Sequence, residues 1–275
     1  MANNTNFPPI ASRLPELMDF ISALAQGYQA GEINSWKIME EKIREFLSPN
    51  ELEKVFAVAP HWRVMASYAE GDTEVHTISA FVALILCPEF QQATQFQQEL
   101  LKWTVLLHDI AKEYHEGKRD FLHAFHSAAV AAETLHSAGF PATPDYDSHI
   151  NSWVTLINTA AIKQDGISGY IQDNQKLPEI YNGIEKLFGH NTPAALIIKT
   201  ILLHASINTL EEWPQAAPLN KSEINQCVDS DLIPFLKVMA LVDSDAYSFF
   251  YEPTKKQFRQ ETLDAFNKLE ALVAA

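Results

Sequence analysis

Residues 104–112 read TVLLHDIAK, an apolar helical run that ends in adjacent His108 and Asp109, with Lys112 one turn further on. The carboxylate follows the apolar stripe directly, so it is buried or nearly so and needs a partner to offset the cost of leaving water. Taken alone, the His-Asp pair is as typical of a capped or exposed helix end as it is of half a metal site. Its meaning therefore depends on partners elsewhere in the chain.

The rest of the chain shows helical periodicity almost throughout and no alternating strand pattern. Apolar residues recur three and four apart, and Gly and Pro interrupt the runs. The longest runs are RLPELMDFISALAQGYQ, TEVHTISAFVALIL, ELLKWTVLLHDIAKEY, FLHAFHSAAVAAETLHSAGF and LIPFLKVMALVDSDAYSFF. The fold class that this pattern predicts is all-α.

Changes in the pattern predict how the 275 residues are organised, a length that suits one large domain. Residues 1–60 are predicted to form an N-terminal accessory helical region, and residues 61–250 the main domain. Within it, residues 141–192 hold scattered Pro, Gly, Asn and Asp, which suits a lid or specificity insert. Residues 251–275 form an amphipathic helix that we expect to pack on the domain.

Charge and composition exclude several classes of partner. The formal charge of −15, from 20 basic and 35 acidic residues, disfavours duplex nucleic acid but allows a small anionic substrate that a metal or a few cations attract. No apolar stretch reaches the roughly 18 residues that span a bilayer. The start, MANNTNFPPI, lacks the features of a secretory signal, and two cysteines form no disulfide framework, so we expect a cytoplasmic location.

Further histidines and aspartates lie on the apolar faces or at the ends of other predicted helices. His76 lies beside small residues in its helix, Asp243 ends the run FLKVMALVD, and His204 ends IIKTILLH. His123 and His126 are three apart and share one helix face. A single histidine on an apolar face is more typical of a hydrogen-bonded core residue. A set of His and Asp residues that converges from five helices indicates a metal site instead.

The order of His76, the pair His108-Asp109, and Asp243 resembles the ligand signature of the HD superfamily of metal-dependent phosphohydrolases. LLHDIAKEY is similar to that family's HD motif, although Ala111 stands where Gly is common. FLHAFHSAAVAAETL is similar to the segment that follows the motif in the HD domains of bacterial CCA-adding enzymes. No nucleotidyltransferase head domain precedes it here, so only the hydrolytic part of that comparison carries over.

The resemblance covers about residues 60–250 and implies an HD-domain helical bundle that binds metal. The implied ligands of one ion are His76, His108, Asp109 and Asp243. Mixed imidazole and carboxylate ligands suit Mn, Fe, Co, Ni or Zn, and such an ion activates water and polarises a phosphoryl oxygen. The function this implies is a phosphomonoesterase or phosphodiesterase that acts on a nucleotide or a similar small phosphorylated substrate.

Several residues extend the implied site. In some members of the superfamily two further histidines complete a binuclear site in which the motif aspartate bridges the metals, and His126 and His204 stand in those places. The alternatives are that these histidines bind substrate phosphate around a single metal, or that His123, otherwise a candidate for substrate binding, replaces His126. One or two metals per chain fit, and we expect one tight ion because a long insert separates these histidines. Lys112 is expected to stabilise phosphate charge, with a solvated lysine as the alternative, and Arg119 to reach a phosphate from the rim.

Two other functions fit the same residues. The set of six candidate ligands also resembles the diiron site of myo-inositol oxygenase-like relatives on the same fold; the six are His76, His108, Asp109, His126, His204 and Asp243. A non-catalytic metal-binding sensor module would keep that fold too. Among the ligands, Asp245 is the alternative to Asp243, but on a helix it points about 200° away. The phosphohydrolase is the predicted function, and a homo-oligomer is compatible with it.

Overall fold

The computed structural model describes residues 7–65, 73–113, 120–164 and 169–274. These residues form fourteen α-helices, two 3-10 turns and two short strands, which confirms the predicted all-α class. None of the described helices combines the length and the apolar character needed to cross a membrane.

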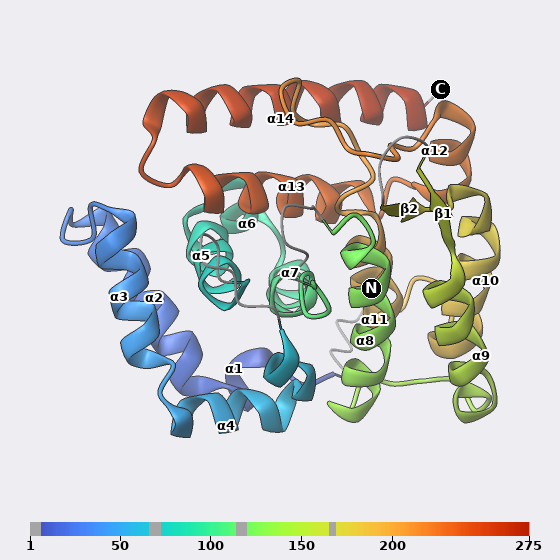
Figure 1. The fold of residues 1–275 in the computed structure, drawn as a ribbon, viewed down its shortest axis with the longest axis horizontal. Helices are drawn as coiled ribbons and strands as arrows, with labels where there is room; N and C mark the ends of the chain where they lie inside the picture. Colours follow the sequence, from blue (N-terminus) through green and yellow to red (C-terminus); the bar gives the residue numbers. More distant parts are fainter. Residues whose placement is uncertain (1–6, 66–72, 114–119, 165–168, 275) are drawn as a thin grey trace.

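The N-terminal helices cover one side of the central helices (Figure 1). They are α1 (Ile10–Arg13), α2 (Pro15–Gln29), α3 (Trp36–Phe46) and α4 (Pro49–Val58), followed by the 3-10 turn η1 (Pro60–Val64). α2 and α3 pack against α5 (Thr73–Leu86), and α1 packs against α7 (Gln95–Leu107). Buried residues of this N-terminal part belong to the same hydrophobic core as those of the central helices.

Five helices form the centre of the molecule, and they pack on one another in pairs. They are α5, α7, α8 (His123–Ser137), α11 (Pro193–Leu203) and α13 (Ile233–Ser248). Nearly every residue of α5 and α11 is buried, which is the pattern of a helix with neighbours on all sides. The short α6 (Pro88–Gln92) follows α5, and the long α14 (Glu252–Val273) lies along α13 (Figure 1).

The segment 141–192, predicted as an irregular insert, contains two helices and a small antiparallel hairpin. Its elements are α9 (Tyr146–Thr159), β1 (Ala161–Lys163), β2 (Tyr170–Gln172), the 3-10 turn η2 (Asn174–Lys176) and α10 (Leu177–Phe188); α12 (Lys221–Cys227) comes later in the chain. The hairpin was not predicted, because three-residue strands are too short to show an alternating pattern. α9 packs on α8 and α10 packs on α11, so this segment extends the helical core.

Some helix ends follow directly from the local sequence. α7 begins with a capping box in which Thr94 and Gln97 satisfy each other's backbone N–H groups. The chain leaves α8 through Gly139, whose φ of +96° favours glycine. One prediction was wrong: α7 ends at Leu107 and does not continue through the His-Asp pair, which lies in the turn that follows.

Gly183 allows α10 to approach α9 closely, and this contact can be tested. A Cβ atom at position 183 would lie 2.0 Å from Cδ1 of Trp153, whose indole N–H donates to the carbonyl of Ile180. Because the indole ring cannot yield without breaking that bond, we expect Gly183→Ala to lower the free energy of unfolding by about 2 kcal/mol or more. Urea unfolding measures this. Asn182→Ala, on the exposed face of the same helix, should change stability by less than about 0.5 kcal/mol.

Candidate metal centre

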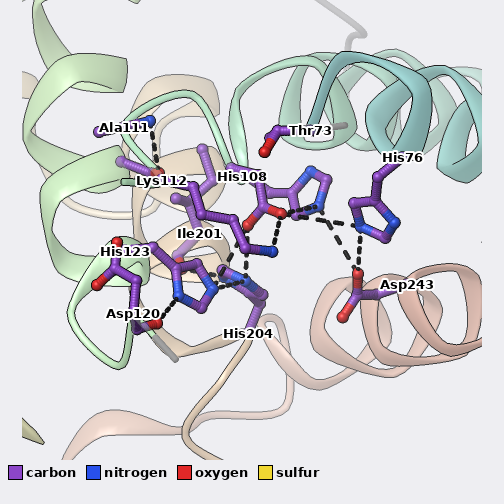
Figure 2. A network of polar contacts seen from close by, with 12 residues as sticks. Thr73, His76, His108, Ala111, Lys112, Asp120, His123, Ile201, His204 and Asp243 are labelled. Atoms are coloured by element: carbon purple, nitrogen blue, oxygen red, sulfur yellow. Dashed lines mark hydrogen bonds and ion pairs between the residues drawn. The ribbon is translucent and has the colours of Figure 1, made fainter. Parts of the chain in front are cut away.

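Six histidine and aspartate side chains from five helices meet near the middle of the bundle (Figure 2). They are His76 on α5, His108 and Asp109 directly after α7, His123 at the start of α8, His204 directly after α11, and Asp243 on α13. They form two groups of three in which the potential ligand atoms all lie within 4.8 Å of one another. The first ligand group is His76, His108 and Asp243, and the second ligand group is Asp109, His123 and His204.

The first ligand group is built around one oxygen of Asp243. Nε2 of His76 lies 2.9 Å from Oδ1 of Asp243, and Nε2 of His108 lies 3.7 Å from the same atom. Both imidazoles are buried, whereas the Asp243 side chain keeps 34% of its surface exposed. The two imidazoles of this group are therefore shielded from solvent, and solvent reaches the group from the side of α13.

The second ligand group has its ring nitrogens close together. Nε2 of His123 lies 3.2 Å from Nε2 of His204, and the two atoms lie 3.4 Å and 3.8 Å from Oδ1 of Asp109. All three side chains are almost completely buried. Three potential donor atoms thus converge on one small volume.

Asp109 connects the two groups, because each of its oxygens faces a different one. Oδ1 faces the second ligand group, whereas Oδ2 lies 3.8 Å from Nε2 of His76 and 3.6 Å from Nε2 of His108. The residue is only 1% exposed. A carboxylate in this position can contact an ion in either group.

Backbone carbonyls fix the orientation of three of the rings. In each case the ring Nδ1 lies within hydrogen-bond distance of the carbonyl three residues earlier in the chain. The pairs are His108 with Val105 (2.9 Å), His123 with Asp120 (2.6 Å) and His204 with Ile201 (2.7 Å). A carbonyl only accepts, so Nδ1 carries the proton in each ring and Nε2 is the atom that faces the other ligands.

The second ligand group fits a cation on its own chemistry. Burial lowers the pKa of His123, and burial followed by the neighbouring His123 and His108 rings lowers that of His204 to about 3. Both rings are therefore neutral, with Nδ1 protonated, so their Nε2 lone pairs face each other at 3.2 Å. Oδ1 of Asp109 beside them is buried and has no hydrogen-bond partner among the described residues. A positive ion would satisfy all three atoms.

The first ligand group holds protons more strongly. Burial alone would lower the pKa of His108, but the Asp109 carboxylate, followed by Asp243, raises it above its usual value. Burial raises the pKa of Asp243, and His108 and His76 more than offset this and lower it well below its usual value. An ion that binds here competes with a proton for the His108 ring, so its affinity depends on pH.

Lys112 and Tyr247 lie beside these groups. Nζ of Lys112 donates to Oδ2 of Asp109 at 2.6 Å, and burial of the ammonium is more than offset by that carboxylate, which raises the pKa of Lys112. Burial raises the pKa of Asp109, but Lys112 and then the neighbouring histidines lower it well below its usual value. The Tyr247 ring stacks on His76 with centroids 4.4 Å apart, and Lys112 also donates to its hydroxyl at 3.5 Å.

Most residues singled out in the sequence lie in this cluster, with clear exceptions. His126 belongs to neither ligand group and is partly exposed one turn further along α8; His123, the alternative, takes its place. Asp245 lies away from the groups and pairs with Arg259 at 3.5 Å, as its position on the helix predicted. Arg119 lies outside the described residues. Sequence reasoning missed Tyr247, although its position four residues after Asp243 places it on the same helix face.

Comparison of the chain with protein-family models, curated proteins and solved structures finds no match. Among the described residues, two His/Asp groups could hold a metal ion. The functional argument depends on their geometry and on the chemistry of their donor atoms.

The neutral state of His204 predicts how the metal-free protein responds to acid. The unfolded chain protonates His204 below about pH 6.5, whereas the folded protein does so only near pH 3. The unfolded state thus binds the extra proton, and His204 removes about 2 kcal/mol of stability between pH 8 and pH 5. Urea unfolding of chelator-treated protein should show this difference. Relative to wild type, the free energy of unfolding of His204→Gln should rise by that amount as the pH falls from 8 to 5.

The matched control is Asn158→Ala, a change at an exposed residue of α9 that carries no titrating group. Its stability difference from wild type should be the same at pH 8 and pH 5. A stability difference between His204→Gln and wild type that is equal at pH 8 and pH 5 would show that His204 is not held neutral.

Proposed function

We propose that the protein is a metal-dependent phosphohydrolase of the HD superfamily that acts on a nucleotide or a similar small phosphorylated substrate. The observation that supports this most is the position of Asp109 between two ligand groups, with one oxygen turned to each. This arrangement suits two ions that share one carboxylate. The sequence favoured a single tight ion, and the geometry of the second ligand group now favours two.

The donor atoms indicate which ions fit. Four imidazoles and two carboxylates suit Mn, Fe, Co, Ni or Zn better than Mg or Ca, which prefer oxygen ligands. In such a centre the bound ions would supply an activated water and polarise a phosphoryl oxygen. The chain's own part is to hold the ligands in fixed orientations through the carbonyl bonds to Nδ1.

Positive charge and exposure favour binding of the substrate on the side of α13. The Lys112 side chain is 18% exposed and its ammonium is directed at Asp109, and Asp243 and Tyr247 are partly exposed beside it. A phosphate that approaches from this side meets Lys112 at the edge of the ligand groups, where the ammonium can pair with phosphate oxygens. The phenol of Tyr247 offers a further donor at the same place.

Removal of ligand residues tests the metal centre and the activity together. We expect Asp109→Asn and His108→Ala to lose most of the bound metal and to abolish phosphate release, because one removes a charge shared by both groups and the other a buried donor atom. Metal per chain is measured by elemental analysis, and turnover by phosphate release from nucleotides with Mn²⁺ added. Exposed His61, changed to Ala, is the control and should match wild type in both assays.

The same measurements distinguish the alternative functions. Wild-type protein without bound metal contradicts the proposal. Iron at two per chain, with oxygen consumption and no phosphate release, identifies an oxygenase. Bound metal with neither activity leaves a metal-binding sensor module.

Lys112 should affect turnover far more than metal content. A charged lysine has no lone pair for a metal, so Lys112→Met should retain the bound ions. Loss of its contact to developing phosphate charge should lower kcat by about 10²–10³-fold. Lys102→Met is the control, since Lys102 forms a comparable i,i+3 ion pair with Glu99 on α7. Wild-type kinetics in Lys112→Met would make Lys112 a structural partner of Asp109 only.

A further inference from the structure

Asp120, whose side chain has no role in the centre described so far, lies where the chain enters α8 and is 8% exposed. Both of its carboxylate oxygens accept backbone N–H groups. Oδ2 accepts from Glu113 at 3.0 Å, and Oδ1 accepts from Leu122 at 2.9 Å. The side chain thus joins the end of the turn that carries Asp109 and Lys112 to the start of α8.

The backbone of Asp120 contacts the second ligand group directly. Its carbonyl oxygen accepts the Nδ1 proton of His123 at 2.6 Å, and Figure 2 shows the two residues side by side. The direction of this carbonyl decides where Nε2 of His123 points, and therefore its 3.4 Å distance to Oδ1 of Asp109. Since both side-chain bonds of Asp120 fix its own backbone, the carboxylate controls the direction of the carbonyl.

A second bond between the same two segments has the same effect. Oγ of Ser127, a fully buried residue of α8, accepts the N–H of Ala111 at 3.1 Å. Two N–H groups in the turn after Asp109, those of Ala111 and Glu113, are therefore held by side chains on or just before α8. These bonds keep Asp109 and His123, which the chain separates by 13 residues, in register.

We propose that Asp120 is a positioning residue for the second ligand group: its carboxylate holds His123 and the Asp109 turn at the separation that one metal ion requires. The inference rests on the metal centre of the proposed function and deepens it. The first ligand group depends on other contacts, because His76 and Asp243 lie on α5 and α13 and His108 is oriented by Val105. Loss of the Asp120 carboxylate should therefore weaken one ion and spare the other.

Titration of the metal-free protein with Co²⁺ tests this, because it needs no knowledge of the substrate. Wild-type protein should bind two ions, seen by visible absorption and by calorimetry. In Asp120→Ala, affinity for one ion should fall by about 10–100-fold, the usual cost of removing a group that orients a metal ligand. Affinity for the other ion should stay within about twofold. Equal weakening of both ions would overturn the positioning role.

Asp229→Ala is the matched control. Oδ1 of Asp229 likewise accepts two backbone N–H groups, those of Asp231 and Leu232, just before α13 begins. This variant loses a comparable pair of bonds at a helix start but none at the second ligand group. It should bind both ions like wild type, so a general loss of stability is separated from a local effect on His123.

If Asp120→Ala does not fold, Asp120→Asn decides. An amide keeps one acceptor oxygen, but its NH₂ group cannot accept the second N–H, so the variant should still bind one ion measurably more weakly than wild type. An Asn variant with wild-type affinity for both ions overturns the proposal. Wild-type protein that binds no Co²⁺ removes the metal centre and this inference together, whereas bound Co²⁺ without phosphate release contradicts only the enzymatic function.

Discussion

Burial of the Asp109 carboxylate is the constraint on which the centre of this molecule depends. An ionised carboxylate with 1% of its surface exposed costs several kcal/mol unless charged or hydrogen-bonding partners surround it. Lys112 supplies the nearest charge, and imidazoles from four helices supply the remaining polar surroundings. The five central helices therefore have to bring their polar side chains together around this one carboxylate.

Helix ends supply most of the polar groups at that point. Carbonyls in the last turn of a helix lack the usual N–H partner four residues further on, and both Val105 on α7 and Ile201 on α11 lie in such a turn. The rings of His108 and His204, which follow these helices directly, donate to those carbonyls. One bond thus satisfies the helix end and orients a potential metal ligand.

The two ligand groups differ in how they are prepared for an ion. Neutral, mutually facing rings in the second ligand group leave lone pairs that a cation or a hydrogen-bond donor can satisfy. In the first ligand group, carboxylates favour protonated imidazole, so an ion competes with protons there. Partial exposure of Asp243 and Tyr247 gives this group its access to solvent. The molecule's net charge of −15 makes a local cation necessary for any phosphate to bind nearby.

The sequence by itself determined the all-α class and five of the six clustered side chains as leading candidates, because helical periodicity and polar residues on apolar faces are local signals. It did not determine that α7 ends before His108, since the turn depends on bonds that its N–H groups donate to Ser127 on α8 and to Asp120 just before α8. Only the tertiary structure decided between His123 and His126. Both share a helix face in sequence, but the start of α8 meets Asp109 at a distance set by contacts remote in the chain.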